Sequence, residues 1–159
     1  MRVLGIDPGS RRTGWGVVQL EGTRLRHVGA GTIALSDRLP LATRLRRIHE
    51  ELAGVIATHH PDAVAVEEIF FAKYANAALK LGHARGIALL VAAESDIGVH
   101  EYPPAIVKRT IVGRGAADKG QIGRLVTALL GLRAPPEEDA ADALAVAITH
   151  IQASRSGLR

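Results

Sequence analysis

The sequence predicts a single α/β domain built on a mixed β-sheet. Three strand-like segments with short connections occupy residues 2–35, and helix-like and strand-like segments alternate from residue 40 onward. Short connections favour antiparallel neighbours, whereas strands separated by a helix favour parallel ones. The chain of 159 residues is about one domain's worth, and its 47% of hydrophobic residues suffices for one buried core.

The N-terminal segments predict three consecutive strands. Arg2–Asp7 is a mostly apolar run that ends at the turn sequence Pro8-Gly9-Ser10. Gly14–Leu20 and Leu25–Leu35 follow, separated only by Glu21-Gly22-Thr23. We expect these strands to form an antiparallel meander.

The next segments predict a helix and then a central strand. From Pro40, apolar residues recur at three- and four-residue spacing as far as Ile56, which indicates an amphipathic helix. His60-Pro61-Asp62 ends this helix. Ala63–Val66 is continuously apolar, as expected for a strand that is covered on both faces.

The C-terminal half predicts three more helices and one more strand. The expected elements are a helix over Ala75–Ala93, a strand over Val99–Tyr102, a helix over Gln121–Leu130 and a last helix from Glu138 to about Ala153. We therefore expect one domain over residues 1–153, followed by a disordered tail over residues 154–159.

Composition excludes several classes of site. There are no cysteines, so disulfides, thiolate metal sites and a cysteine nucleophile are excluded. The 20 Lys and Arg residues outnumber the 16 Asp and Glu residues, and a net charge of +4 suits an anionic partner. No apolar run approaches the roughly 20 residues of a membrane span, and no signal peptide is recognisable, so we expect a soluble, cytoplasmic protein.

Four carboxylates stand where chemistry is expected. Asp7 ends the first strand, and Glu67 directly follows the apolar strand. Asp139 and Asp142 are three residues apart and would share one face of the last helix. If the two strands are neighbours and the helix packs beside them, all four acids converge at the sheet edge. Such acids repel one another unless cations neutralise them, and oxygen ligands suit the Mg²⁺ or Mn²⁺ pair used for phosphodiester hydrolysis.

Each acid taken alone also has a simpler interpretation. Asp7-Pro-Gly-Ser10 is a common turn sequence, and Glu137-Glu138-Asp139 is a typical acidic first turn of a helix. Neither interpretation explains an acid directly after four apolar strand residues. Because strand residues alternate between faces, Glu67 and Glu68 point in opposite directions, and we assign Glu67 to the cluster.

Charge and aromatic residues indicate a nucleic-acid partner. Between Ile69 and Arg124, eight basic residues face four acidic ones, so this segment carries the whole net charge. A basic segment beside a metal site suits a polyanion, although a solvated surface is the alternative interpretation. Phe70 and Phe71 follow Glu67 closely, and an exposed phenylalanine could stack on an unpaired base; core packing is the alternative.

Several stretches together resemble the RuvC family of Holliday-junction resolvases. The matching stretches are Gly5-Ile-Asp-Pro-Gly-Ser10, Val66-Glu-Glu-Ile-Phe70, Ala72-Lys73, Ala78-Leu-Lys-Leu-Gly82, Ala84-Arg-Gly86, Val107-Lys108, Val112-Gly113, Asp139-Ala-Ala-Asp-Ala-Leu-Ala145 and Ile148-Thr-His150. They follow the family's order and spacing over nearly the whole chain.

The resemblance implies a ribonuclease H-like fold with a five-stranded mixed sheet flanked by helices. It also implies a Mg²⁺-dependent endonuclease that acts as a homodimer on four-way DNA junctions in recombination and repair. The two active sites would make paired nicks in strands of like polarity and leave 5′-phosphate and 3′-hydroxyl ends. RuvA and RuvB are partners implied by the same analogy.

The resemblance also implies residue roles. The family's catalytic, metal-binding acids correspond to Asp7, Glu67, Asp139 and Asp142. Its wedge aromatic corresponds to Phe70, and two lysines that hold the scissile phosphate correspond to Lys108 and Lys119. Lys73, which lies in a matching stretch, is a further DNA-binding candidate.

Three other functions stay open at this point. A nucleotide-binding domain of the actin, Hsp70 and sugar-kinase superfamily has a similar opening, but it binds ATP between two such domains. A DNA-architecture module without catalysis and a ribonuclease H acting on RNA–DNA hybrids are the other two.

The small residues Ala75, Ala78, Gly82 and Gly86 share a helical face that fits either a partner helix or the protein's own sheet.

Overall fold

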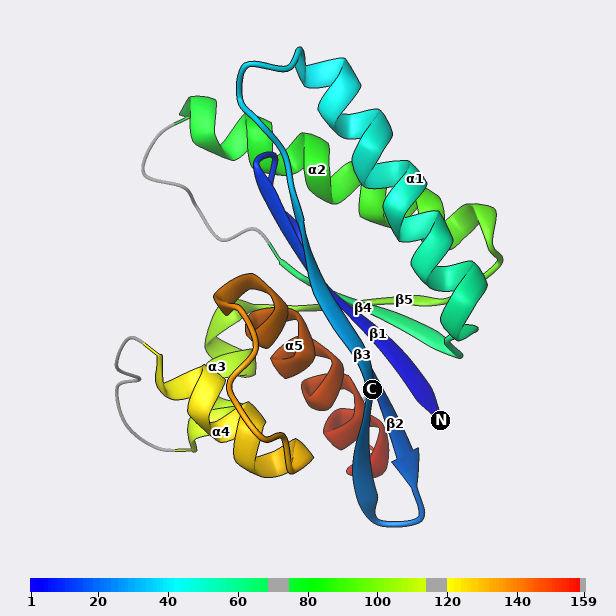
Figure 1. The fold of residues 1–159 in the computed structure, drawn as a ribbon. Coiled ribbons are helices and arrows are strands. Elements are labelled where there is room, and N and C mark those ends of the chain that lie inside the picture. Colours follow the sequence, from blue (N-terminus) through cyan, green and yellow to red (C-terminus); the bar gives the residue numbers. More distant parts are fainter. Residues whose placement is uncertain (69–74, 114–119, 158–159) are drawn as a thin grey trace.

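The computed structural model places one five-stranded sheet between two helical layers (Figure 1). It describes residues 1–68, 75–113 and 120–157. The strands are β1 (Arg2–Asp7), β2 (Arg12–Glu21), β3 (Arg24–Ala34), β4 (Ala63–Glu67) and β5 (Val99–Tyr102), and the helices are α1 (Leu41–His59), α2 (Ala75–Glu94), α3 (Pro104–Val112), α4 (Gln121–Leu130) and α5 (Glu138–Arg155).

The sheet is mixed, as the connection lengths predict. Its strand order is β3-β2-β1-β4-β5. The N-terminal meander is confirmed, because β1 pairs with β2 and β2 with β3 in antiparallel fashion. The strands that follow helices, β4 and β5, pair in parallel with β1 and β4 respectively.

Two features of the C-terminal half of the chain differ from expectation. The sequence analysis assigned no helix between Pro103 and Gln121, yet α3 begins with Pro104 in its first turn, where a missing N–H costs nothing. The last helix also ends two residues later than expected, since α5 continues to Arg155 and the Ser154 hydroxyl donates to the His150 carbonyl. Within the described residues, no helix is both long and apolar enough to cross a membrane.

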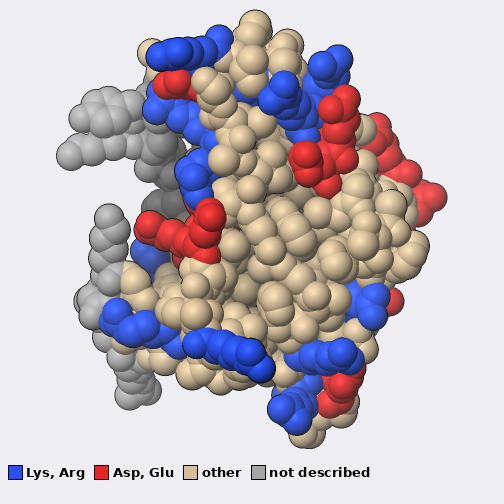
Figure 2. Space-filling model, in the orientation of Figure 1, with Lys and Arg blue, Asp and Glu red and all other residues tan. Residues whose placement is uncertain are grey.

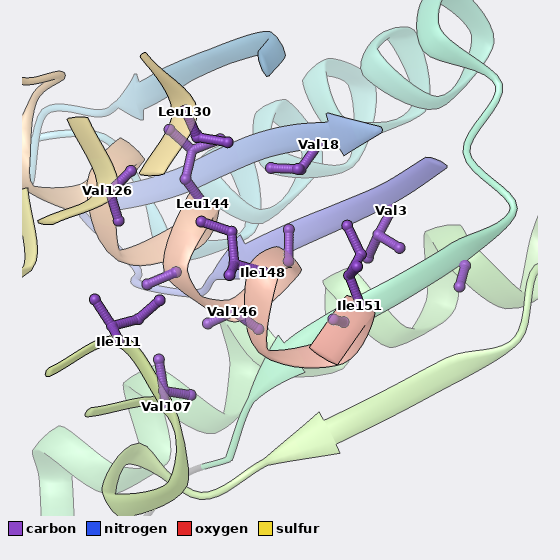
Figure 3. Close-up of a cluster of buried hydrophobic side chains, with 14 residues drawn as sticks. Val3, Val18, Val107, Ile111, Val126, Leu130, Leu144, Val146, Ile148 and Ile151 are labelled. Atoms are coloured by element: carbon purple, nitrogen blue, oxygen red, sulfur yellow. The ribbon is translucent and has the colours of Figure 1, made fainter. Parts of the chain in front are cut away.

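The two faces of the sheet bury separate clusters. On one face, Val3 and Val18 pack with α3, α4 and α5 around Leu144, Ile148 and Ile151 (Figure 3). On the other face, strand residues that include Leu4, Ile6, Val64 and Val66 pack against α1 and α2. The alternation of each strand decides the face: in β1, Val3 belongs to the first cluster and Leu4 to the second.

Glycines bring α5 unusually close to the sheet. A Cβ atom at Gly5 would lie 2.0 Å from the Ala143 carbonyl oxygen, and one at Gly16 would lie 2.6 Å from the Leu144 side chain. No real side chain tolerates such distances. The helix backbone therefore rests directly on β1 and β2, and α5 holds its position along both strands.

Candidate active site

Asp7 and Glu67 end two adjacent parallel strands. Ile6 of β1 is paired with Val66 of β4, so the two acids directly follow a matched pair. The neighbours two residues earlier, Gly5 and Ala65, lie on the face covered by α5. By alternation, Asp7 and Glu67 also belong to the α5 face, at the carboxyl ends of both strands. The expected adjacency of the two strands is thus confirmed.

The start of α5 lies over the first of these acids. Asp7 is the cross-strand partner of Gly14 on β2. A Cβ atom at Gly14 would lie only 1.9 Å from the Asp139 carbonyl oxygen, so the first turn of α5 rests on this glycine. The missing side chain at Gly14 therefore brings Asp139, and Asp142 one turn later, to the end of β1.

The carboxylates interact electrostatically. Burial, and after it the charges of Glu67, Asp142 and Asp139, together raise the pKa of Asp7 to about 8. Burial and the charge of Asp142 raise the pKa of Glu67 to about 7. The pKa of Asp142 rises to about 6 through burial and the neighbouring acids Glu138 and Asp139. The four acids, from two strands and one helix, thus form one repelling cluster.

Lys108 counteracts part of this repulsion. This exposed residue of α3 lowers the pKa of both Glu67 and Asp142 by its positive charge. The predicted phosphate-holding lysine thus lies within electrostatic reach of the acids, on the helix that the sequence analysis did not anticipate.

The turn after Asp7 is held from two sides. The buried Thr13 hydroxyl donates to the Gly9 carbonyl over 2.7 Å, and the Gly9 N–H donates back to the same hydroxyl over 3.3 Å. Arg44, a buried residue of α1, donates from Nη1 to the Ser10 carbonyl over 2.9 Å. These bonds restrict the backbone that carries Asp7 into the site.

Arg12 pairs with the acids at the start of α5. Its Nε donates to Asp139 Oδ2 over 2.6 Å, and its Nη2 donates to Glu137 Oε2 over 2.8 Å. One guanidinium thus connects the start of β2 to the first turn of α5.

The four carboxylates suit divalent cations by their chemistry, although the described side chains are not close enough together to form a metal site. Within residues 1–68, 75–113 and 120–157, no three His, Asp or Glu side chains come close enough together to hold a metal ion. The chemistry of the cluster nevertheless suits Mg²⁺ or Mn²⁺, because carboxylates that are buried together gain most from a hard cation. Asp7, Glu67, Asp139 and Asp142 are the residues that would hold it.

Basic side chains border this region. Figure 2 shows a group of acidic side chains at the left of the molecule with Lys and Arg side chains above and below it. A hollow of about 600 Å³ adjoins the turn after Asp7, and its lining includes Gly9, Ser10, Asn76 and Lys80. The surface around the acids therefore offers positive charge to a polyanion.

Comparison with known proteins identifies the family. A family model described as crossover junction endodeoxyribonuclease RuvC matches residues 3–150. The chain belongs to the RuvC family. RuvC of Sorangium cellulosum is 58% identical over 154 residues, which cover 97% of this chain and 86% of that protein. RuvC of Rhodopseudomonas palustris strain BisA53 is 55% identical over 150 residues, or 94% of this chain and 86% of that protein.

Solved structures agree with this RuvC assignment. Thermus thermophilus RuvC shares 39% identity and a TM-score of 0.90, with 99% of this chain and 98% of that chain covered. The same protein in complex with a Holliday-junction substrate has a TM-score of 0.93 at 39% identity, covering 99% and 97% of the two chains. Together with the sheet topology, these matches confirm the expected RuvC family, the ribonuclease H-like fold and the endodeoxyribonuclease class.

Three of the predicted RuvC site residues lie outside the described residues. These are the aromatic candidate Phe70 and the lysines Lys73 and Lys119, and Phe71 lies there too. Their roles stay predictions, as do those of the four acids and Lys108.

Several residues that support the acids were not predicted from the sequence. Arg12, Thr13 and Arg44 were not identified, and neither was the helix that carries Lys108. The sequence signal for the first two was their position directly after the Asp7 turn, where a basic and a hydroxyl side chain can reach backbone and acids. Arg44 had no such signal, because its partner at Ser10 is 34 residues away.

Proposed function

We propose that the protein is a Holliday-junction resolvase that hydrolyses phosphodiester bonds with divalent cations held by Asp7, Glu67, Asp139 and Asp142. The observation that carries this proposal is the convergence of partly buried, mutually repelling acids at the ends of β1 and β4 and the start of α5. Such repulsion is costly in a folded protein and useful where cations relieve it. Membership of the RuvC family supports the choice of a four-way DNA junction as substrate.

The chemistry follows from these groups. Two bound Mg²⁺ ions would supply an activated water and stabilisation of the departing 3′ oxygen. Asp7, whose pKa all three other acids help to raise, would hold the cations together with Glu67, Asp139 and Asp142. Lys108 would offset charge on the phosphate under attack, and Lys119 would assist it. The products would carry 5′-phosphate and 3′-hydroxyl ends, which a ligase can seal.

The DNA would bind across the basic surface beside the acids. Two lysines provide positive charge near the acids: Lys80 lines the hollow next to the Asp7 turn, and the charge of Lys108 reaches Glu67. Phe70 and Lys73 follow Glu67 closely in sequence, so we assign them to the DNA side of the site. In this proposal, Phe70 stacks at the crossover, where bases lose their partners.

A symmetric dimer would present two such sites. The outward face of α2 carries Leu79 and Leu90, which are 63% and 47% exposed, together with Gly82 and Gly86. A Cβ at either glycine would have no neighbour within 4 Å among the described residues, whereas Ala84 and Ala88 face the core. This favours a partner helix over the protein's own sheet as the use of this face.

A symmetric dimer formed through α2 would contain two nuclease domains. Each protomer would contribute one nuclease domain, from β1 to the end of α5, and the pair would nick two strands of like polarity. RuvA and RuvB enter the proposal through the family resemblance alone.

The direct test is cleavage of a synthetic four-way junction with each strand labelled in turn. We expect Mg²⁺-dependent nicks at symmetric positions in one pair of opposed strands, and junctions that a ligase reseals. A linear duplex and an RNA–DNA hybrid serve as matched substrates. Preferential cleavage of the hybrid would replace the proposal with a ribonuclease H, and junction binding without any nick would indicate an architectural protein.

A further inference from the structure

Arg12 forms an ion pair with Asp139, one of the acids of the proposed metal site. Its Nε lies 2.6 Å from Asp139 Oδ2, a charge-assisted hydrogen bond of the shortest kind. The Asp139 side chain is 23% exposed and the Arg12 side chain 49%, so the pair sits at the mouth of the cluster, not within it. An oxygen engaged by a guanidinium is less available to a second cation.

The same guanidinium has a second anchor. Nη2 of Arg12 lies 2.8 Å from Glu137 Oε2, two residues before Asp139. If Asp139 turns toward a cation, Arg12 keeps Glu137 as its partner and is not left as an unpaired charge. Exchange of Asp139 between guanidinium and metal therefore costs little.

The backbone permits this exchange without moving α5. The carbonyl of Asp139 rests on Gly14, and the helix is held along β1 by Gly5. Only the side chain of Asp139 is free to change partner. Arg12 itself is fixed at its base in β2, where it pairs with Ala34 of β3.

We propose that Arg12 is a positioning residue that competes with the divalent cation for Asp139 and so weakens cation binding at the active site. This inference rests on the proposed metal site. Arg12 holds Asp139 while the cation sites are not fully occupied. When the cations bind, Asp139 leaves Arg12, and Arg12 stays paired with Glu137. The affinity for cations is thus set by a residue that is not itself a ligand.

The neighbouring arginine provides a matched control. Arg11 carries the same charge one residue earlier, but its Nη2 pairs with Asp37 over 2.8 Å and not with the acid cluster. Arg12→Gln removes the competitor, Arg11→Gln removes an equal charge at almost the same place, and Arg12→Lys keeps the charge. Both positions are exposed, so folding should survive each of the three changes.

The experiment is a titration of the full chain with MgCl₂, without DNA, followed by calorimetry and by the rise in unfolding midpoint. We expect Arg12→Gln to lower the Kd for Mg²⁺ by roughly two- to fivefold, the range an exposed ion pair supports. Arg12→Lys and Arg11→Gln should stay near the wild-type value.

The outcomes separate this inference from the proposed function. If the wild type takes up no Mg²⁺, or if Asp7→Asn leaves its uptake unchanged, the proposed metal site itself is wrong. If the wild type binds normally but Arg12→Gln binds equally well or more weakly, Arg12 is not a competitor. An equal gain in Arg11→Gln would also overturn the inference, because it would reflect net charge alone.

Discussion

The two faces of the sheet are built from different side chains. On the α1 and α2 face, large aliphatic residues of α1 such as Ile48 and Leu52 pack in one cluster with large strand residues such as Leu4. On the α5 face, glycines on β1 and β2 meet a helix that has alanine at five of its eleven buried positions. The candidate active site lies on the second face alone.

This difference shows how the fold positions charge. A bulky interface tolerates small shifts, since side chains repack when a helix slides. A backbone resting on backbone has no such freedom, so the acids of α5 stay aligned with Asp7 and Glu67. On the other face, α1 and α2 contribute large side chains to the core, and the outer side of α2 stays exposed.

The largest expected effect is on chemistry. Asp7→Asn should reduce junction cleavage by about a thousandfold or more, because the acid that interacts with all the others loses its charge. Junction affinity in a gel-shift assay should survive, since the basic surface is unchanged. Glu67→Gln should act similarly and Glu68→Gln should not. Robust cleavage by Asp7→Asn would remove the acids from the mechanism.

The close approach of α5 to the sheet can be tested by adding one methyl group at Gly5. Gly5→Ala would place a Cβ 2.0 Å from the Ala143 carbonyl, and we expect the free energy of unfolding to fall by about 3 kcal/mol or more. Gly54→Ala, on α1 with open space around it in the described structure, should be neutral or stabilising by up to about 1 kcal/mol. Urea unfolding of both variants measures the contrast. Equal effects would mean that the contact between Gly5 and Ala143 does not constrain the position of α5.

A third prediction concerns the pH dependence of stability. The pKa of Asp7 is about 8 in the folded protein against an ordinary value of 3.8, so the folded state holds a proton that the unfolded state releases. Stability from this group is therefore present at low pH and is lost as pH rises toward 8. In EDTA, Asp7→Asn should be more stable than wild type at pH 8 by on the order of 1–3 kcal/mol, and the gain should shrink toward pH 4.

The informative quantity in that experiment is the difference in stability between wild type and Asp7→Asn at each pH. Burial and the charge of His100 together lower the pKa of His150 to about 4, so this residue destabilises both wild type and variant as pH falls from about 6.5 to 4. The contribution cancels between wild type and variant. Thermal melts at each pH provide the measurement, and a gain that does not depend on pH would contradict the proposed repulsion.

The smallest effect is expected on the opposite helical layer. Leu90→Lys should weaken self-association about tenfold, because a charge enters the outward face of α2. Leu129→Lys on α4, where the leucine is 43% exposed, is the matched control and should change nothing. Sedimentation equilibrium distinguishes the two. An unaffected dimer in Leu90→Lys would place the interface elsewhere.

The regular elements could largely be predicted from sequence. Turn residues such as Pro8-Gly9 and Pro61-Asp62 end β1 and α1 where expected, and the apolar run before Glu67 is a central strand. The helix α3 escaped prediction because its nine residues are too few for a clear apolar period. Asp7 and Glu67 could be singled out because an acid after an apolar strand is a local signal.

Local pattern therefore determined which acids are candidates, which strands carry them and which of the two glutamates faces α5. Only the tertiary structure decided that α5 lies directly on Gly14, that Lys108 lies in range of the acids, and that Arg12 shares Asp139 with Glu137. The physical reason is separation along the chain: Arg12 and Asp139 are 127 residues apart. Periodicity reports which face a residue occupies, but it carries no information about which distant side chain lies opposite.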